Sequence, residues 1–405
     1  MNLAYFISKR ISREEKGTFS ATIHKIAIAS IGIGLAEMIV SFLILKGFQD
    51  TVTNKIYGFS SHIQITKYSL GNSFEEIPIS LDNEFLESYR EYELIDHVQE
   101  YSLKAGLLKN EETQGVIVKG VSDRFDLKRF NDNLIEGRFL NFSDPNYAKE
   151  VVISKTIADK LILEVNDDIT IHFFMDPPRP RKLKVVGIYE TNLADYYDDK
   201  FVLSDIRMIQ RLNNWGDSLA GGFEVFVEDV NRIEEAETLL DEILDYQLYV
   251  EKVSDKYVQV FEWLFLISRQ VNIFLGIILL VVCVNMVSII LILIMERTQM
   301  IGLLKSLGAT NQQIRRIFTY NGIRLITKGL VLGNVLGVSV CALQYYLKLI
   351  PLNAKDYYMS YVPVGWDLQI ILILNVLTLV VVGLIILLPT LAIIRIDPIK
   401  TIKFD

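Results

Sequence analysis

Four long apolar runs divide the chain into membrane-spanning and polar parts. Each run contains roughly 20 or more mostly apolar residues, which is the length that a helix needs to cross about 30 Å of hydrocarbon. The runs lie at residues 26–45, 271–295, 329–347 and 368–394, and charged or polar residues bracket each of them. The pattern predicts four transmembrane helices, with a large polar domain between the first two.

The polar domain switches between strand-like and helical periods. Segments 61–68 and 97–108 alternate between apolar and polar residues and predict strands. A helical stretch lies between them, and we expect its N-cap to be Ser80 or Asp82. The same order of strand, helix and strand returns at 222–253. Two such units predict a mixed α/β domain with a ferredoxin-like split β-α-β lobe.

A strand-rich insertion at about residues 111–214 is expected to form a second, smaller lobe. Within it, a proline-rich segment joins two alternating strands. Proline fixes φ and cannot donate to a sheet, so this segment predicts a stiff projecting loop. The loop comprises Met175, Asp176, Pro177, Pro178, Arg179 and Pro180. A binding loop and a plain hairpin loop explain the pattern equally well.

The charge of the polar segments predicts their orientation. The segments before the first run, between the second and third runs and after the fourth carry about +9 in total, which leaves about −17 for the large domain. Positive loops stay in the cytoplasm, so we expect both termini there and the large domain outside. The expected order is a cytoplasmic arm (1–25), a first helix (26–48), the external domain (49–263), a second helix (264–295), a cytoplasmic segment (296–328), a third helix (329–348), an external loop (349–367), a fourth helix (368–394) and a cytoplasmic tail (395–405).

The sequence favours no intrinsic chemistry. Its four histidines are scattered without ligand spacing, so we expect no metal site. It contains no G-x-x-x-x-G-K-[ST] segment, so any ATP would be bound by another chain, and no G-x-S-x-G segment indicates a hydrolase. We therefore expect a non-catalytic membrane protein without a nucleic-acid partner.

Two features of the apolar runs are not explained by hydrophobicity alone. Gly329, Gly333 and Gly337 recur at four-residue spacing, which leaves one helix face small enough for close contact, either within the bundle or between two chains. Glu37 lies near the middle of the first run, where an ionised carboxylate costs on the order of a few kcal/mol unless it is shielded. It is expected to face protein or a wet cavity, as a hydrogen-bonded residue of the bundle or as part of a substrate path.

The polar segment after the second run predicts a helical hairpin. Four apolar residues fall at i, i+3, i+4 and i+7 of a short helix and are Met300, Leu303, Leu304 and Leu307. Gly308 is placed to end this helix in a left-handed cap. Thr310 and Gln313 form a capping-box pattern that opens the next helix. An exposed apolar stripe of this length requires a partner surface or the lipid interface.

Several segments resemble one family. MERTQMIGLLKSLGATNQQIRRIF, at 295–318, resembles the signature E-x-x-x-x-I-x-x-L-x-x-L-G-A-x-x-x-x-I of the FtsX/MacB-type ABC transporter permeases. EVVISKTIADKLILEVNDDITI, at 150–171, looks like the external domain of that family. LKGFQDTVTNKIYGFSSHIQI, at 45–65, and the overall length are most similar to the lipoprotein-releasing permeases of the LolC/LolE type.

The resemblance implies that the short helix is a coupling helix. In this family it docks on a separate dimer of ATPase subunits, which would hold ATP and Mg²⁺, while the permease binds no cofactor. The residues that the resemblance assigns to this contact are Glu296, Met300, Ile301, Leu303, Leu304, Leu307 and Gly308. Movement of the coupling helix would be transmitted mechanically to the external domain.

The resemblance also implies the partners. A second permease subunit, the same chain or a related one, would complete the complex in the bacterial inner membrane. Lipoprotein cargo would enter between the first two spans. The candidates to line this path are chosen from their location in those spans and are Glu37, Met38, Phe42 and Phe274, and the resemblance itself assigns no role to Glu37. The proline-rich loop lies where LolC-type subunits carry the hook that engages a periplasmic lipoprotein carrier.

Two other functions of the superfamily remain open at this point. An FtsX-like signalling permease would use the same motion to control a periplasmic cell-wall hydrolase. A MacB-like pump component would export small molecules or peptides. The length and the two-lobed external domain argue against the first, and the absence of a fused ATPase argues weakly against the second.

Overall fold

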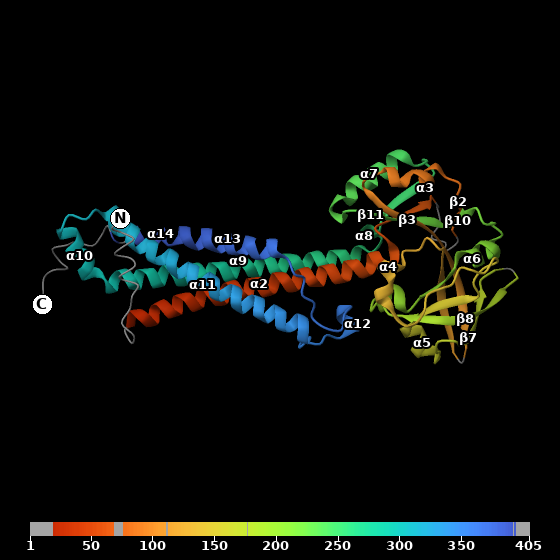
Figure 1. Ribbon diagram of the computed structural model, residues 1–405, viewed down its shortest axis with the longest axis horizontal. Coiled ribbons are helices and arrows are strands. Elements are labelled where there is room, and N and C mark those ends of the chain that lie inside the picture. Colours follow the sequence, from red (N-terminus) through yellow and green to blue (C-terminus); the bar gives the residue numbers. More distant parts are fainter. Residues whose placement is uncertain (1–18, 69–75, 111, 176, 392, 394–405) are drawn as a thin grey trace. The chain divides into compact units, whose positions relative to one another are not determined.

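The computed structural model describes residues 19–68, 76–110, 112–175, 177–391 and 393 (Figure 1). Most of the predicted N-terminal arm, the predicted tail and Asp176 lie outside these residues. The chain forms two compact units. One, here called the helical unit, contains Met1–Asp50, Trp263–Pro351 and Tyr361–Asp405, and the other, the sheet unit, contains Thr51–Glu262 and Leu352–Ser360.

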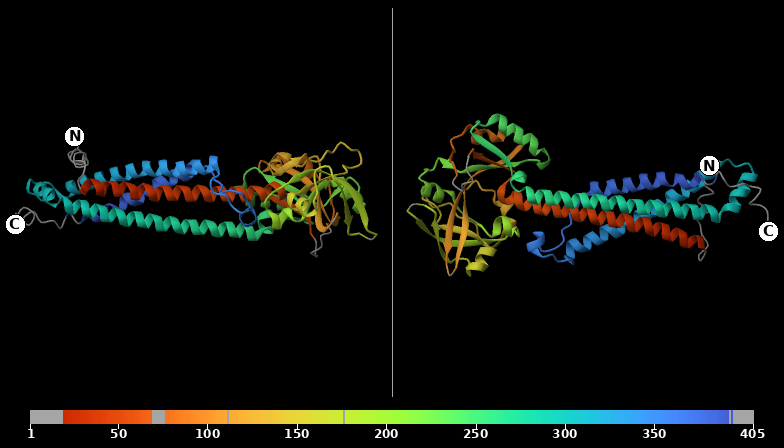
Figure 2. Two further views of the ribbon diagram at one scale, coloured as in Figure 1. Left: turned by 90° about the horizontal axis from the view of Figure 1, so that it is seen from below. Right: turned by 180° about the vertical axis from the view of Figure 1, so that it is seen from behind.

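The helical unit is a bundle of long helices that run side by side (Figure 2). The described residues contain four helices that are long and apolar enough to cross a membrane, which confirms the prediction of four transmembrane helices. The helices are α2 (Phe19–Ser60), α9 (Val258–Glu296), α11 (Asn311–Leu347) and α13 (Leu368–Ile385), with α10 (Thr298–Ser306) between α9 and α11 and α14 (Leu387–Thr390) after α13. The first three extend beyond their apolar runs, and α2 and α9 each continue from one unit into the other.

Small residues set the spacing of α11 and α2. A Cβ atom placed on Gly329 would lie 2.7 Å from the Cβ of Ile31, and one on Gly333 would lie 2.8 Å from the carbonyl oxygen of Gly32. Gly337 meets Ala36 in the same way, at 3.2 Å. The three glycines therefore line a close contact inside the bundle of this chain.

The sheet unit contains a ten-stranded sheet with the order β12-β1-β11-β3-β4-β9-β6-β8-β5, and β7 pairs with β3 and β8. Its strands are β1 (Ile63–Lys67), β3 (Ile95–Lys109), β4 (Thr113–Val121), β5 (Leu134–Gly137), β6 (Glu150–Ser154), β7 (Asp168–Phe173), β8 (Arg179–Tyr189), β9 (Phe201–Asp205), β11 (Gly222–Val227) and β12 (Leu248–Lys252). Strands β2 (Ile79–Ser80) and β10 (Leu219–Ala220) form a separate pair. The helices of this unit are α3 (Glu84–Ser88), α4 (Leu127–Phe130), α5 (Lys155–Leu161), α6 (Ile206–Asn213), α7 (Ile233–Ile243), α8 (Val253–Lys256) and α12 (Ala354–Tyr357).

Two hydrophobic cores define two lobes in this unit, and its predicted mixed α/β class is confirmed. In the first lobe, α3 and α7 pack on one face of β12, β1, β11 and the first part of β3 (Figure 1). In the second lobe, α5 and α6 pack against β4 and the strands that follow it. Strand β3, with 15 residues, belongs to both lobes, because β11 pairs with its first half and β7 with its last residues.

The N-cap predicted for the helix at 80–92 is wrong. Asn83 caps α3, because its side chain accepts a hydrogen bond from the backbone of Phe85 at 3.1 Å. Ser80 belongs to β2, and its hydroxyl accepts a hydrogen bond from the backbone of Asp82 instead. Of the three polar residues that could cap the helix, Ser80 is therefore engaged in strand pairing with β10.

The proline-rich loop is also shorter than predicted. Arg179 and Pro180 are the first residues of β8 and pair with Phe173 and His172 of β7. Proline is tolerated there because β6 meets β8 only from Lys184 onward, so the start of β8 lies at an edge of the sheet.

Candidate functional site

The hairpin between α9 and α11 has the local structure that its sequence predicts. Gly308 follows α10 with φ +90°, and its N–H donates to the carbonyl of Lys305 at 3.0 Å. Thr310 caps α11, since its hydroxyl accepts from the backbone of Gln313 while the Gln313 side chain accepts from the backbone of Thr310. The predicted left-handed glycine cap and the capping box are both confirmed.

The two faces of α10 differ in burial. Ile301 is fully buried in the core of the bundle, and Met300 and Leu304 pack against the same core. Leu303 and Leu307 are exposed, with 57% and 76% of their surface accessible. The interpretation of Ile301 as a docking residue is therefore wrong, because it lies opposite Leu303 on the helix and holds α10 to its own bundle. Glu296 and Gly308 are exposed and remain available to a partner.

Lys305 joins this hairpin to the end of the last helical segment. Its ammonium donates to the carbonyl of Ile393 at 2.9 Å. The guanidinium of Arg315, in the first turns of α11, donates to the hydroxyl of Thr390 at 3.4 Å. Sequence reasoning assigned Lys305 no role. The structure shows that it fixes α10 against a segment far along the chain.

One surface of the helical unit carries polar groups at positions where lipid would be expected. Glu37 is exposed on α2, and no described residue forms a hydrogen bond or an ion pair with it. Ser30, Ile33 and Glu37 lie at i, i+3 and i+7 and so share one face of α2. Asn285 of α9 donates to Ser30 at 2.9 Å and is itself exposed. The interpretation of Glu37 as a hydrogen-bonded residue within its own bundle is wrong for the described residues.

The other residues predicted along the cargo path lie in different environments. Met38 is buried in the core that α2 shares with its neighbouring helices, so it cannot line an open surface. Phe42 packs at the border of that core, and Phe274 on α9 is exposed. The polar surface of α2 and α9 is here called the α2–α9 face and is defined by Ser30, Glu37, Phe274, Asn285 and Ser288.

The second lobe contains a hollow beside the β7–β8 hairpin. At the tip of the hairpin Phe174 is exposed, while Met175 packs against the core of the lobe. The hollow has a volume of about 680 Å³. It is lined by residues of both charges, among them Lys149, Asp168, Arg181, Lys182 and Lys184.

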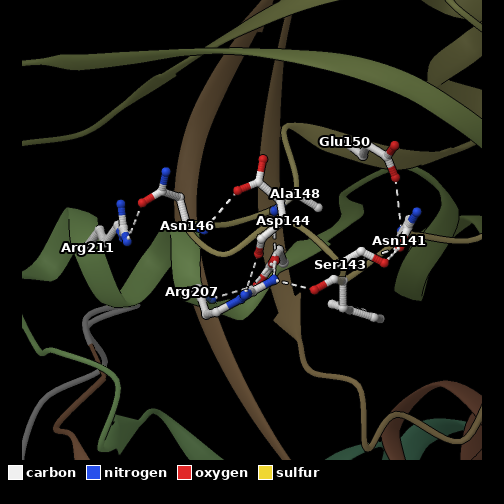
Figure 3. Close-up of polar contacts among 10 residues, drawn as sticks. Asn141, Ser143, Asp144, Asn146, Ala148, Glu150, Arg207 and Arg211 are labelled. Atoms are coloured by element: carbon white, nitrogen blue, oxygen red, sulfur yellow. Dashed lines mark hydrogen bonds and ion pairs between the residues drawn. The ribbon is translucent and has the colours of Figure 1, made fainter.

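The buried carboxylate of Asp205 holds the loop that borders this hollow. Figure 3 shows Arg207 beside the loop residues Asp144 and Asn146. Asp205 accepts hydrogen bonds from the backbone of Ala148 at 2.8 Å and from the guanidinium of Arg207 at 2.6 Å, and this pairing raises the pKa of Arg207. Arg207 in turn donates to the carbonyls of Asp144 and Phe142 at 2.8 and 3.1 Å. The loop is thereby attached to α6. Sequence reasoning missed this clamp, for which the only local signal is an Asp at the N-cap of a helix followed two residues later by Arg.

Comparison with known proteins finds relatives along most of the chain. The family described as MacB-like periplasmic core domain matches residues 26–243, and the family described as FtsX-like permease C-terminal matches residues 272–398. The lipoprotein-releasing system transmembrane protein LolE of Haemophilus influenzae is 25% identical over 352 residues, which cover 84% of this chain and 82% of that protein. The corresponding LolC of Neisseria meningitidis is 21% identical over 385 residues, 91% of each chain. The crystal structure of the periplasmic region of MacB from Actinobacillus actinomycetemcomitans aligns with a TM-score of 0.35 and 16% identity, over 51% of this chain and 95% of that one.

Proposed function

The chain belongs to the ABC transporter permeases that combine a MacB-like periplasmic core domain with an FtsX-like C-terminal domain, and we propose that it releases lipoproteins from the inner membrane. The observation that carries the proposal is the similarity to lipoprotein-releasing permeases over 84 to 91% of the chain. In this proposal both termini are cytoplasmic, and the sheet unit is periplasmic and passes cargo toward the outer membrane.

The coupling surface of the proposed transporter is the exposed face of α10. A separate dimer of ATPase subunits binds ATP and Mg²⁺ and contacts Leu303 and Leu307, whose exposure supports this role. The bond from Lys305 to Ile393 makes the last helical segment move together with α10. Since α9 is one continuous helix from Val258 to Glu296, it is suited to carry that displacement toward the sheet unit.

The α2–α9 face is the proposed cargo surface. A second permease subunit, identical or related, covers it and leaves a wet cavity between the two chains. Glu37, Asn285 and Ser288 support this arrangement, because polar groups at membrane depth normally face protein or water. Phe274 offers apolar contact to acyl chains on the same face.

The carrier site in this proposal is the tip of the β7–β8 hairpin with the neighbouring hollow. Phe174 provides an exposed apolar contact, and Lys149, Arg181, Lys182 and Lys184 provide charged ones. The clamp formed by Asp205 and Arg207 holds one wall of the hollow in place, which supports a preformed surface.

We also interpret the first lobe as ferredoxin-like. Its strand order β12-β1-β11-β3, antiparallel throughout, supports this interpretation, as do the two helices α3 and α7 on one face.

Reconstituted complex tests the function. We expect ATP-dependent transfer of a lipidated protein from proteoliposomes to a soluble carrier, and we expect Leu303→Asp to abolish it. Leu303→Met keeps the apolar surface and is the matched control. Leu304 is less suitable as the residue to substitute, because it is partly buried and its replacement would affect both docking of the partner and folding of the bundle. ATP hydrolysis without any transfer would contradict the proposal and favour the FtsX-like signalling permease or the MacB-like pump.

A further inference from the structure

The C-terminal end of α2 is held by a buried ion pair in the sheet unit. The Lys119 ammonium donates to the carbonyl of Phe59, in the last turn of α2, and to the Oε1 atom of Glu224 at 2.7 Å. Lys119 and Glu224 are 2% and 1% exposed. We propose that Lys119 is the positioning residue that couples movement of α2 to both lobes, an inference that rests on the proposed function.

The pair connects three separate elements. Lys119 lies on β4 of the second lobe, and Glu224 lies on β11 of the first lobe. The Phe59 carbonyl belongs to α2. The last carbonyls of a helix have no partner within it and carry partial negative charge, so a buried cation is favourable at this end. A single ammonium therefore joins the helix end to both lobes.

Aromatic contacts attach the same helix end to the second lobe. The ring of Phe59 stacks on Tyr197, with 4.3 Å between the ring centroids. The rings of Phe201 and Tyr189 lie 5.4 and 5.9 Å from it. Next to Phe59, the hydroxyl of Ser60 donates to the hydroxyl of Tyr197 at 2.9 Å. Phe59 thus occupies a socket that leaves little freedom for α2 to move without the lobe.

The first lobe receives α2 through the backbone. Ser61 adopts the left-handed region with φ +64° and turns the chain directly from α2 into β1. The N–H of His62 then donates to the carbonyl of Val225 on β11 at 3.1 Å. Glu224 precedes that residue, and its other oxygen accepts from Gln99 of β3 at 2.8 Å. The acid is therefore itself fixed from two sides.

A role in stability alone does not account for this pair. Replacement of a buried ion pair by apolar residues of similar volume is often neutral or stabilising. An apolar pair would fill the same space, but only a donor at position 119 bonds the Phe59 carbonyl and the carboxylate at the same time. The position of the bond, between a membrane helix and two lobes, is what a transmitter of movement requires.

The test compares stability with coupling in the complete complex. Lys119→Met leaves the Glu224 carboxylate buried without its cation, so we expect a lower Tm. The double variant Lys119→Met with Glu224→Gln removes both charges, and we expect Tm to recover. Lipoprotein release per ATP hydrolysed is expected to stay at least about tenfold below that of the wild type, the factor that corresponds to the lower end of the range for loss of one hydrogen bond to a charged group.

A second ion pair provides the control. Lys252 and Glu237 form a 2.6 Å, partly exposed pair in the first lobe, and among the described residues their side chains form no hydrogen bond or ion pair with α2, so Lys252→Met with Glu237→Gln should leave release per ATP unchanged. A double variant at Lys119 and Glu224 that recovers both Tm and release would overturn the proposal. If that variant does not fold, Lys119→Met alone is measured at a temperature below its Tm, and release per ATP equal to that of the wild type would overturn the proposal equally.

A distance measurement separates this proposal from the proposed function. Spin labels at Tyr246→Cys in the first lobe and Lys160→Cys in the second, in a chain with Cys283 and Cys341 replaced by serine, report the separation of the lobes. We expect ATP to change that separation in the wild type and not in the double variant. This result would stand even if no lipoprotein were released, whereas an unaltered ATP response in the double variant would overturn the coupling role.

Discussion

Glu37 and Glu224 are two carboxylates that differ in whether the described residues of the chain supply them with a hydrogen-bonding partner. Glu224 is buried in the sheet unit and accepts hydrogen bonds from Lys119 and Gln99. Glu37 lies among apolar residues of α2, faces outward and has no partner among the described residues. The chain itself supplies hydrogen-bond donors to Glu224, and its described residues supply none to Glu37.

The difference indicates where each acid acts. Removing a carboxylate from water costs several kcal/mol, so a buried one persists only where its own fold supplies a cation or donors. A carboxylate exposed at membrane depth meets the same cost from lipid unless something outside the chain shields it. Glu224 is therefore explained by the fold of the chain, whereas Glu37 requires a second subunit, water or cargo.

The largest expected effect is that of Glu224→Gln on stability. The change leaves the Lys119 ammonium buried without a counter-charge, which costs about 3–5 kcal/mol. Thermal unfolding of the purified complex should show a much lower midpoint than for Glu37→Gln, which serves as the control. A loss of less than about 1 kcal/mol would mean that the pair is not buried in solution.

Glu76 provides an intermediate case that pH can test. It accepts a hydrogen bond from the backbone of Leu103 at 2.7 Å, and burial raises its pKa from 4.5 to about 8. The folded state binds this proton more tightly than the unfolded state, so the stabilisation is complete below pH 4.5 and is lost as pH rises through about 8.

The measurement compares unfolding at pH 6.5 and at about pH 8. Below pH 6.5 His62, whose pKa burial lowers to about 4, contributes in the opposite direction. Over the chosen window the wild type should lose about 2 kcal/mol, at about 1.4 kcal/mol per pH unit. Glu76→Gln should flatten this decline, and an equal decline in the variant would contradict the assignment.

Arg207→Met is expected to destabilise the protein less than Glu224→Gln does. Asp205 loses its guanidinium partner but keeps other hydrogen-bond donors. Asp205 would retain the backbone N–H groups of Ala148 and of residue 207, so the cost should be about 1–3 kcal/mol. Hydrogen exchange should accelerate in the loop at residues 142–146, which loses two bonds to its backbone. Unchanged exchange in that loop would show that the clamp does not hold it.

Glu37→Gln should change stability least, by less than about 0.5 kcal/mol, because its own chain does not pair the acid. Its effect is expected in the assembled complex, as slower release of lipoprotein in proteoliposomes. Glu37→Asp keeps the charge and is the control. Release at the wild-type rate by Glu37→Gln would remove the need for an outside partner and weaken the contrast with Glu224.

Features that depend on neighbouring residues could be predicted from the sequence. The four helices follow from the length of their apolar runs. The glycine cap at Gly308 and the capping box of Thr310 and Gln313 use residues within one turn of each other, so their pattern is visible in the sequence. The resemblance to the permease family rests in part on the same hairpin and is confirmed by the family matches.

Predictions failed where a distant segment chose among local alternatives. Ser80, Asp82 and Asn83 can each cap a helix, and pairing of Ser80 with β10 left the cap to Asn83. Arg179 and Pro180 became strand because β7 pairs with them. In each case the sequence correctly predicted the type of element, a helix cap or a loop, and pairing with another strand decided at which residue it begins or ends.

The sequence by itself determined the number of candidate membrane helices, the glycine cap and capping box of the hairpin between α9 and α11, and the family, because these depend on composition and short-range spacing. Only the tertiary structure decided that Met38 is buried while its neighbour Glu37 is exposed, since successive residues point about 100° apart on a helix and the packing of other helices selects the buried side. Lys119 and Glu224 lie 105 residues apart, and their pairing depends on the register of strands that meet only in the folded sheet.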